Sequence, residues 1–336
     1  MRVFNADHHG ETGNPRFLKV INMLPNAPAA TNLSTVMSEK EITSIIAKHG
    51  PLTGAMLVEK TGIDVLHLWQ LCRKNKNMRL ETAGNRFLRL DRNVKGYARL
   101  SPSIRREFLT YTFIGLHNQA AELKEKVEVF RRETDRISRE KRDIAEQSIA
   151  STVDIMPEKN VILAKACFIL AGDVVYGMSH AVSRPEKSTG EMVRGSDLDI
   201  IVVTWDDLDP EVSRSLDNNI HKRKHLLLVN DREEIDYLIK SMSRVREQLS
   251  FDKFSSMVAS KILNEGQFFY GNRDVFREVK KLVAEYGIPD KLEALEKQAI
   301  HNRELAEAQL LDIDMETESS EYLNLFFTRA EEDEIY

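Results

Sequence analysis

Two aspartates stand two residues apart at the head of a β-branched run, in the segment 195–203 with the sequence GSDLDIIVV. Because side chains alternate between the two faces of a strand, Asp197 and Asp199 are expected to project from the same face. Like charges held that close are destabilising unless a cation lies between them. Carboxylate oxygens suit Mg²⁺ or Mn²⁺, the metals that bridge triphosphate oxygens. Taken alone, the pattern also fits a turn that leads into a strand with both acids solvated.

A glycine turn precedes this pair in the sequence. Residues 161–171 form a nearly continuous apolar run, which predicts a buried strand that ends at Gly172. A short helix is expected from Asp173 to Gly177, and a polar loop follows at 183–190. The chain is therefore predicted to run from strand to glycine turn, short helix, loop and acidic strand.

This order resembles the nucleotidyltransferase superfamily typified by DNA polymerase β, over roughly residues 160–275. In that family a Gly-Ser turn cradles the triphosphate, two acids bind metal ions, and a third carboxylate on a neighbouring strand activates the attacking hydroxyl. The resemblance implies an NTP substrate, with Asp197 and Asp199 as catalytic ligands of Mg²⁺ or Mn²⁺. The nucleotide-binding residues that it implies are Gly172, Asp173, Gly177 and Ser196.

The third carboxylate is sought on an apolar strand downstream. Asp236 lies between Ile235 and Tyr237 and is the predicted catalytic base, with Glu234 on the same face as the second choice. The same segment also fits helical spacing, and in that case neither acid is catalytic.

One residue departs from the family pattern. Asp173 stands where the family places serine, so a carboxylate would lie beside the triphosphate and repel it. Either a metal or a basic side chain neutralises Asp173, or nucleotide binding is altered or lost. Because both metal-binding acids are present, we expect an active enzyme.

The N-terminal region predicts a winged helix-turn-helix. Three short helices are expected from Ser38 to His49, from about Thr53 to Thr61, and after Asp64. Residues 79–92 then predict two strands joined by a turn at 83–85, and this hairpin would be the wing.

Basic residues are concentrated around the third helix and the wing. Residues 73–106 hold eleven Lys or Arg against the two acids Glu81 and Asp91, which favours phosphate contacts. Alternatively, this basic face is simply solvated or contacts an acidic protein surface. A second basic cluster at 221–225 fits either phosphate binding or a solvated helix end. The predicted nucleic-acid-binding residues are Arg73, Lys74, Lys76, Arg86, Arg89 and Arg92.

Composition limits the class of protein. The chain has 336 residues, 42% hydrophobic and 30% charged, with a net charge of −5, so any affinity for nucleic acid must be local. No run of 18 apolar residues occurs, so no membrane partner is expected. The two cysteines lie far apart and suggest no disulfide framework. We therefore expect a cytoplasmic protein, of undetermined oligomeric state.

The fold class expected is α+β, with a polymerase-β-like core around a mixed sheet. The predicted divisions are a lead-in arm (1–36), a winged helix-turn-helix (37–116), a connector helix (117–157), a nucleotidyltransferase core (158–275) and a C-terminal helical region with an acidic tail (276–336).

These features predict a metal-dependent nucleotidyltransferase that moves an NMP from an NTP to an acceptor hydroxyl, with nucleic acid as the expected acceptor. The alternative is a nucleic-acid-binding regulator whose degenerate transferase domain senses a nucleotide or mediates an interaction. Asp173 is the residue that favours this alternative.

Overall fold

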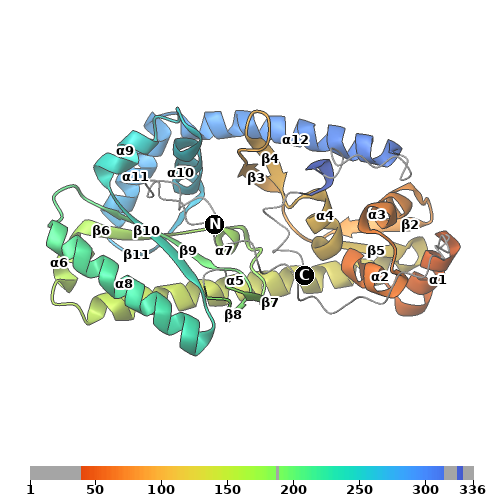
Figure 1. Ribbon diagram of the computed structural model, residues 1–336, viewed down its shortest axis with the longest axis horizontal. Helices are drawn as coiled ribbons and strands as arrows, with labels where there is room; N and C mark the ends of the chain where they lie inside the picture. Colours follow the sequence, from red (N-terminus) through yellow and green to blue (C-terminus); the bar gives the residue numbers. More distant parts are fainter. Residues whose placement is uncertain (1–38, 187–188, 314–323, 328–336) are drawn as a thin grey trace, which may run out of the picture.

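The computed structural model describes residues 39–186, 189–313 and 324–327. The chain forms two lobes, and two long helices, α5 (Ala120–Asp154) and α12 (Ile288–Asp312), run along both of them on opposite sides (Figure 1). The mixed α+β class is confirmed. Across the described ranges, none of the helices combines the length and apolar character needed to cross a membrane. The predicted lead-in arm and the acidic residues 331–334 lie outside the described ranges.

The first lobe contains the expected short helices. Side-chain caps begin two of them: Thr53 accepts from the Met56 amide and Asp64 from the Leu66 amide. Gly62 ends the second helix in the left-handed region, with φ of 67°. The elements of this lobe are α1 (Glu39–His49), β1 (Leu52–Thr53), α2 (Gly54–Thr61), α3 (Val65–Lys74), β2 (Met78–Thr82) and β5 (Thr112–Leu116).

The expected pairing of two strands within residues 79–92 is wrong. β2 pairs with β5 in a sheet of order β1-β5-β2, whereas β3 (Phe87–Leu90) pairs with β4 (Ala98–Ser101). The reason is burial, because Leu88 and Leu100 join the hydrophobic core of the second lobe. The chain then returns to β5 through α4 (Ile104–Arg106) and a π-helical turn at Glu107–Tyr111.

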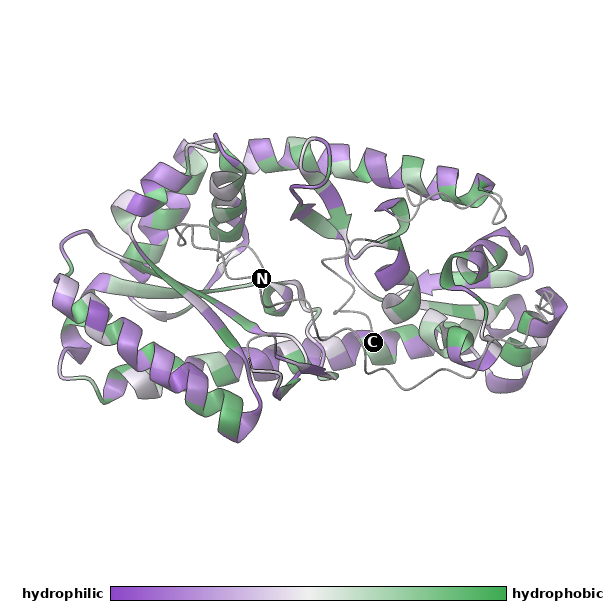
Figure 2. Cartoon of the chain, viewed as in Figure 1, coloured by the Kyte–Doolittle hydropathy of each residue, from purple (hydrophilic) through white to green (hydrophobic). Residues whose placement is uncertain are grey.

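The expected long helix is α5, of 35 residues, and it contributes to two cores. Leu123 and Val127, near its start, pack with Phe113 of β5. Ala145 and Ile149, farther along, belong to the core beneath the sheet of the second lobe. The helix therefore holds both lobes through its thin apolar stripe, which alternates with polar residues along its length (Figure 2).

The second lobe is built on a mixed sheet of order β10-β9-β6-β11. β9 runs parallel to β10 and antiparallel to β6, and β6 is antiparallel to β11. The apolar run at 161–171 is divided, since its first part continues a helix and its second part is β6. The strands are β6 (Ala166–Ala171), β9 (Leu198–Thr204), β10 (Ile235–Ser241) and β11 (Gln267–Gly271).

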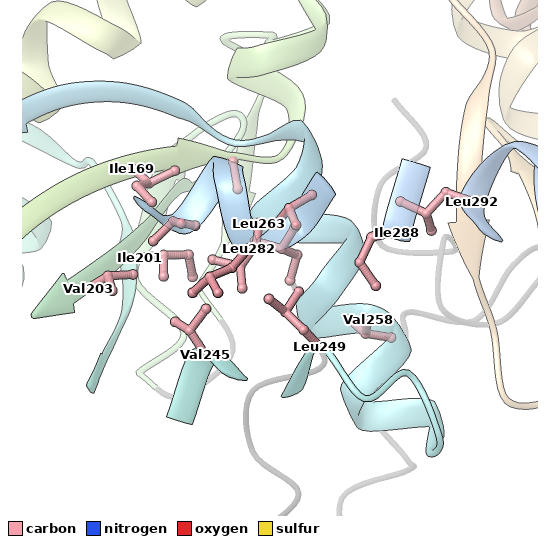
Figure 3. Close-up of a cluster of buried hydrophobic side chains, with 14 of the residues drawn as sticks. Ile169, Ile201, Val203, Val245, Leu249, Val258, Leu263, Leu282, Ile288 and Leu292 are labelled. Atoms are coloured by element: carbon pink, nitrogen blue, oxygen red, sulfur yellow. The ribbon is translucent and has the colours of Figure 1, made fainter. Parts of the chain in front are cut away.

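Helices cover both faces of this sheet, which explains why every residue of β6 and β9 is buried. One face packs against α5, α6 and α8 and the other against α9 to α12, where Ile169 and Ile201 meet Leu263 and Leu282 (Figure 3). A small hairpin occupies the predicted polar insertion. The remaining elements are α6 (Lys159–Lys165), α7 (Asp173–Tyr176), β7 (Ser183–Pro185), β8 (Met192–Arg194), α8 (Pro210–Asp231), α9 (Met242–Gln248), α10 (Phe254–Glu265) and α11 (Arg273–Glu285).

Leu88→Ala tests the packing of the β3–β4 hairpin on the second lobe. Leu88 is 4% exposed, so its truncation is expected to lower the free energy of unfolding by about 2–5 kcal/mol. Leu305→Ala is the matched control, because Leu305 is 49% exposed and its loss should cost little. Equal urea midpoints for the two variants would contradict this packing.

Candidate active site

The structure brings the three predicted aspartates to one end of the sheet. Asp199 is the second residue of β9 and pairs in register with Asp236 on the parallel neighbour β10. Paired residues of adjacent strands project from the same face, so both carboxylates lie on one side. Asp197 immediately precedes β9, and its charge acts on Asp199 together with that of Asp236. Segment 235–241 is a strand, so the helical alternative is wrong.

The predicted glycine turn packs against Asp199. Ala171, the last residue of β6, pairs with Asp199, and Gly172 follows it with φ of 72° and ψ of −155°. A Cβ atom on Gly172 would lie 2.2 Å from the Asp199 Oδ2 atom. Both the backbone conformation and the lack of space therefore require glycine here.

Asp199 is a buried carboxyl, 3% exposed. Burial raises its pKa to about 7, and the negative charges of Asp197 and Asp236 contribute to this rise. A divalent cation between these acids would oppose both effects, because it favours the charged carboxylate.

Asp236 is held by a basic residue from α8. The Lys224 Nζ donates to Asp236 Oδ1 at 2.7 Å, and both side chains are partly exposed. Lys224 belongs to the basic cluster 221–225, whereas its neighbour Arg223 bonds Ser151 and Thr152 on α5. The cluster therefore divides between the acidic site and the packing of two helices.

Glu234, the second choice for the base, pairs with another cation. The Arg184 Nη2 lies 2.8 Å from Glu234 Oε2, and both side chains are largely buried. Since Glu234 lies before β10, whereas Asp236 lies on β10 in register with Asp199, Asp236 remains the better candidate.

Basic side chains also fix the loop that leads into β9. The Lys141 Nζ, from α5, donates to the carbonyls of Arg194 and Ser196 and to Glu233. Arg184 Nε donates to the Gly195 carbonyl at 2.8 Å. Lys141 lies on the segment predicted as a connector helix, and Arg184 lies on the predicted polar loop.

The remaining predicted nucleotide-binding residues gather near this loop. The Ser196 hydroxyl lies 3.4 Å from Asp173 Oδ2 and accepts from the His180 amide at 3.3 Å. Gly177 ends α7 with φ of 68°, and a Cβ there would lie 2.8 Å from Asp135 on α5. The turn at 172–177 is thus packed against β9 on one side and α5 on the other.

Asp173 has a basic neighbour that the sequence analysis did not single out. The Arg106 Nη2 lies 3.8 Å from Asp173 Oδ2, and the Arg106 side chain is 3% exposed. Arg106 was counted only within the basic stretch 73–106, because its position beside the turn depends on contacts between distant segments.

The donor set fits Mg²⁺ or Mn²⁺ bound together with a polyphosphate. No group of three or more His, Cys, Asp or Glu side chains suited to a metal ion forms within the described ranges. Mg²⁺ usually takes one or two carboxylates from the protein and fills its remaining positions with water and substrate phosphates. Asp197 and Asp199 match that requirement.

Two pockets flank this site, and neither is lined by the three aspartates. A pocket of about 110 Å³ lies between the lobes, with Gly84 and Tyr111 on one side and Gly177 on the other. A second, of about 280 Å³, lies beside α5 and includes Lys141 and Glu233.

The predicted nucleic-acid-binding residues do not form one open surface. Glu307 of α12 lies 2.8 Å from Arg73 and 3.0 Å from Arg86, and Arg86 also pairs with Glu107. Arg92 lies over the Phe254 ring of α10. Arg89 on β3 is partly buried, while Lys74 and Lys76 are exposed at the end of α3. Arg73 and Arg86 are therefore engaged in ion pairs within the chain.

The end of α12 also covers α3. The Gln70 amide donates to the Leu310 and Ile313 carbonyls, at 2.7 and 3.1 Å. Trp69 lies 6.1 Å, between ring centroids, from Phe326. Only the last residues of α3, Arg73 and Lys74, are exposed along this helix.

Comparison with protein families, curated proteins and solved structures gave no significant match to this chain.

Gly172→Ala tests the contact between the turn and Asp199. The added Cβ must displace the carboxylate and the backbone must take a strained conformation, so we expect a loss of about 2–4 kcal/mol in the free energy of unfolding. Gly62→Ala is the control: its φ is also positive, at 67°, but nothing lies within 4 Å of the new Cβ. Its cost should be about 1 kcal/mol. Denaturant unfolding measures both, and equal losses would show that the contact contributes nothing.

Proposed function

We propose that this protein is a metal-dependent nucleotidyltransferase. It would transfer the NMP unit of an NTP to an acceptor hydroxyl and release pyrophosphate. The observation that carries the proposal is the packing of the Gly172 turn against buried Asp199, with Asp236 in register on the next strand.

The order of elements supports this proposal. A strand (β6), a glycine turn, a short helix (α7), a strand that follows two acids (β9) and a neighbouring strand with a third acid (β10) match the pattern of the polymerase-β-like family. The two faces of the sheet are covered by helices, and the three acids lie at one end of it, where the Asp236 side chain is 35% exposed and Asp199 is buried.

The metal would be held by Asp197 and Asp199, and when bound it neutralises the developing charge on the phosphates. Asp236 is the base that takes the proton of the acceptor hydroxyl. The bond between the acceptor oxygen and the α-phosphorus forms, the bond from that phosphorus to the bridging oxygen breaks, and pyrophosphate leaves with the electron pair. Lys224 holds the Asp236 carboxylate in place through its hydrogen bond.

The order of elements in the first lobe supports its assignment as a winged helix-turn-helix. Its helices and strands follow the order α1, β1, α2, α3, β2, β5, with the sheet order β1-β5-β2. Residues 83–111 would then be a long insertion at the wing. Because α12 covers α3, we propose that a nucleic-acid acceptor is contacted by exposed Lys74 and Lys76 at the helix end rather than by the length of α3.

The regulator alternative depended on Asp173, the acid in place of serine. A basic side chain, Arg106, lies beside that carboxylate, as an active enzyme would require. Both cysteines in the chain, Cys72 and Cys167, are free and buried, which fits action in the cytoplasm.

Transfer of label from each α-labelled NTP to RNA, DNA or protein tests the proposal. In the presence of Mg²⁺ or Mn²⁺, Asp197→Asn and Asp199→Asn should each reduce transfer by about 100-fold or more, because each removes a charged metal ligand. Asp231→Asn, an exposed position at the end of α8, is the matched control and should retain transfer.

Unaltered melting temperatures would show that the two site variants still fold. The proposal would be refuted if the two site variants, Asp197→Asn and Asp199→Asn, transferred as much label as the control Asp231→Asn.

A further inference from the structure

A basic side chain from the first lobe lies beside the glycine turn at residues 172–177 of the second lobe. Arg106 ends α4, in the segment between β2 and β5, yet its guanidinium lies beside Asp173, the first residue after the glycine turn. Arg106 Nη2 is 3.8 Å from Asp173 Oδ2 and 3.4 Å from the Tyr111 hydroxyl. The Arg106 side chain is buried, so its charge is weakly screened by water.

The first lobe fixes the position of this arginine. The Ser103 hydroxyl accepts from the Arg106 amide, and Ile104 and Phe108 on either side belong to the core that contains α1 to α3. Arg303 of α12 donates to the Pro102 carbonyl at 2.9 Å, and this bond connects α12 to the same segment. Arg106 is therefore held by the packing of two elements that lie far from Asp173 in the sequence.

The second lobe fixes the position of the carboxylate. Asp173 begins α7, its carbonyl accepts from the Met178 amide, and the Ser196 hydroxyl lies 3.4 Å from its Oδ2 atom. The backbone of Gly172 is pressed against Asp199. The backbone of Asp173 is therefore held next to the residues that are proposed to bind phosphate.

We propose that Arg106 is a positioning residue of the nucleotide site, which neutralises Asp173 so that the turn at Gly172 accepts the phosphates of an NTP. This inference rests on the proposed function and deepens it, since it makes the nucleotide site a joint product of both lobes. The nucleotide then binds tightly only when the first lobe is packed against the second.

A double-mutant cycle on nucleotide binding tests this role. Calorimetry would measure the affinity for the Mg²⁺ complexes of non-hydrolysable α,β-methylene analogues of ATP, GTP, CTP and UTP. Arg106→Gln should weaken binding about tenfold or more, because Asp173 then faces the phosphates without its cation. Asp173→Asn should bind at least as tightly as the wild type, and Arg106→Lys should stay within about threefold of it.

The decisive variant carries Arg106→Gln and Asp173→Asn together. If Arg106 acts through Asp173, this variant should recover binding to within about threefold of Asp173→Asn alone. A merely structural role for Arg106 predicts the same loss with either residue at 173, and that result would overturn the inference while leaving the proposed function intact. Melting temperatures identify any variant that fails to fold, and the comparison of Arg106→Lys with Arg106→Gln then separates charge from packing.

If the wild type binds none of the four analogues, the proposed function is overturned, and the inference with it. Binding by the wild type that Asp199→Asn abolishes and Arg106→Gln leaves unchanged would overturn the inference alone.

Discussion

The candidate site depends on a close contact between the backbone of Gly172 and the buried carboxyl of Asp199. The antiparallel register of β6 and β9 places Ala171 opposite Asp199. The next residue must be glycine, because a Cβ atom on Gly172 would collide with the Asp199 carboxyl. On the other side of β9, the parallel register of β10 aligns Asp236 with Asp199. The positions of the turn and of two acids are thus set by the pairing of β6, β9 and β10.

This arrangement costs stability, and the surrounding structure has to offset the cost. A carboxyl that is buried and has acidic neighbours is unfavourable in its charged form, as the raised pKa of Asp199 indicates. Hydrophobic cores on both faces of the sheet hold the strands that carry it. A buried carboxyl whose pKa is raised by burial and by acidic neighbours is a feature often found at functional sites.

The two lobes act as one unit around the site. α5 contributes Lys141, which fixes the loop before β9, and the segment before β5 contributes Arg106. α12 ties that segment down through Arg303, and the Glu307 carboxylate beside it engages Arg73 and Arg86. Four of the basic residues at 73–106 therefore contact α12 or the second lobe, namely Arg73, Arg86, Arg92 and Arg106.

Local patterns were sufficient for part of this description. The helices α1 to α3, the long α5 and the helices after β11 follow from periodicity and caps, whereas the segment around Asp236 fitted a strand and a helix equally well. No local pattern in the sequence indicated the contacts between distant segments. The hairpin was predicted wrongly because Leu88 pairs with Leu100 and packs with residues far along the chain. Arg106 gave no local sign that it would reach Asp173.

The most direct test of the central claim is metal binding, followed as the loss of the free Mn²⁺ signal in electron paramagnetic resonance. If the acids beside Gly172 hold a cation together with phosphates, a non-hydrolysable NTP analogue should tighten Mn²⁺ binding by about tenfold or more in the wild type. Asp199→Asn should abolish that gain. Mn²⁺ binding that is equal in the two proteins, with and without the analogue, would contradict the account.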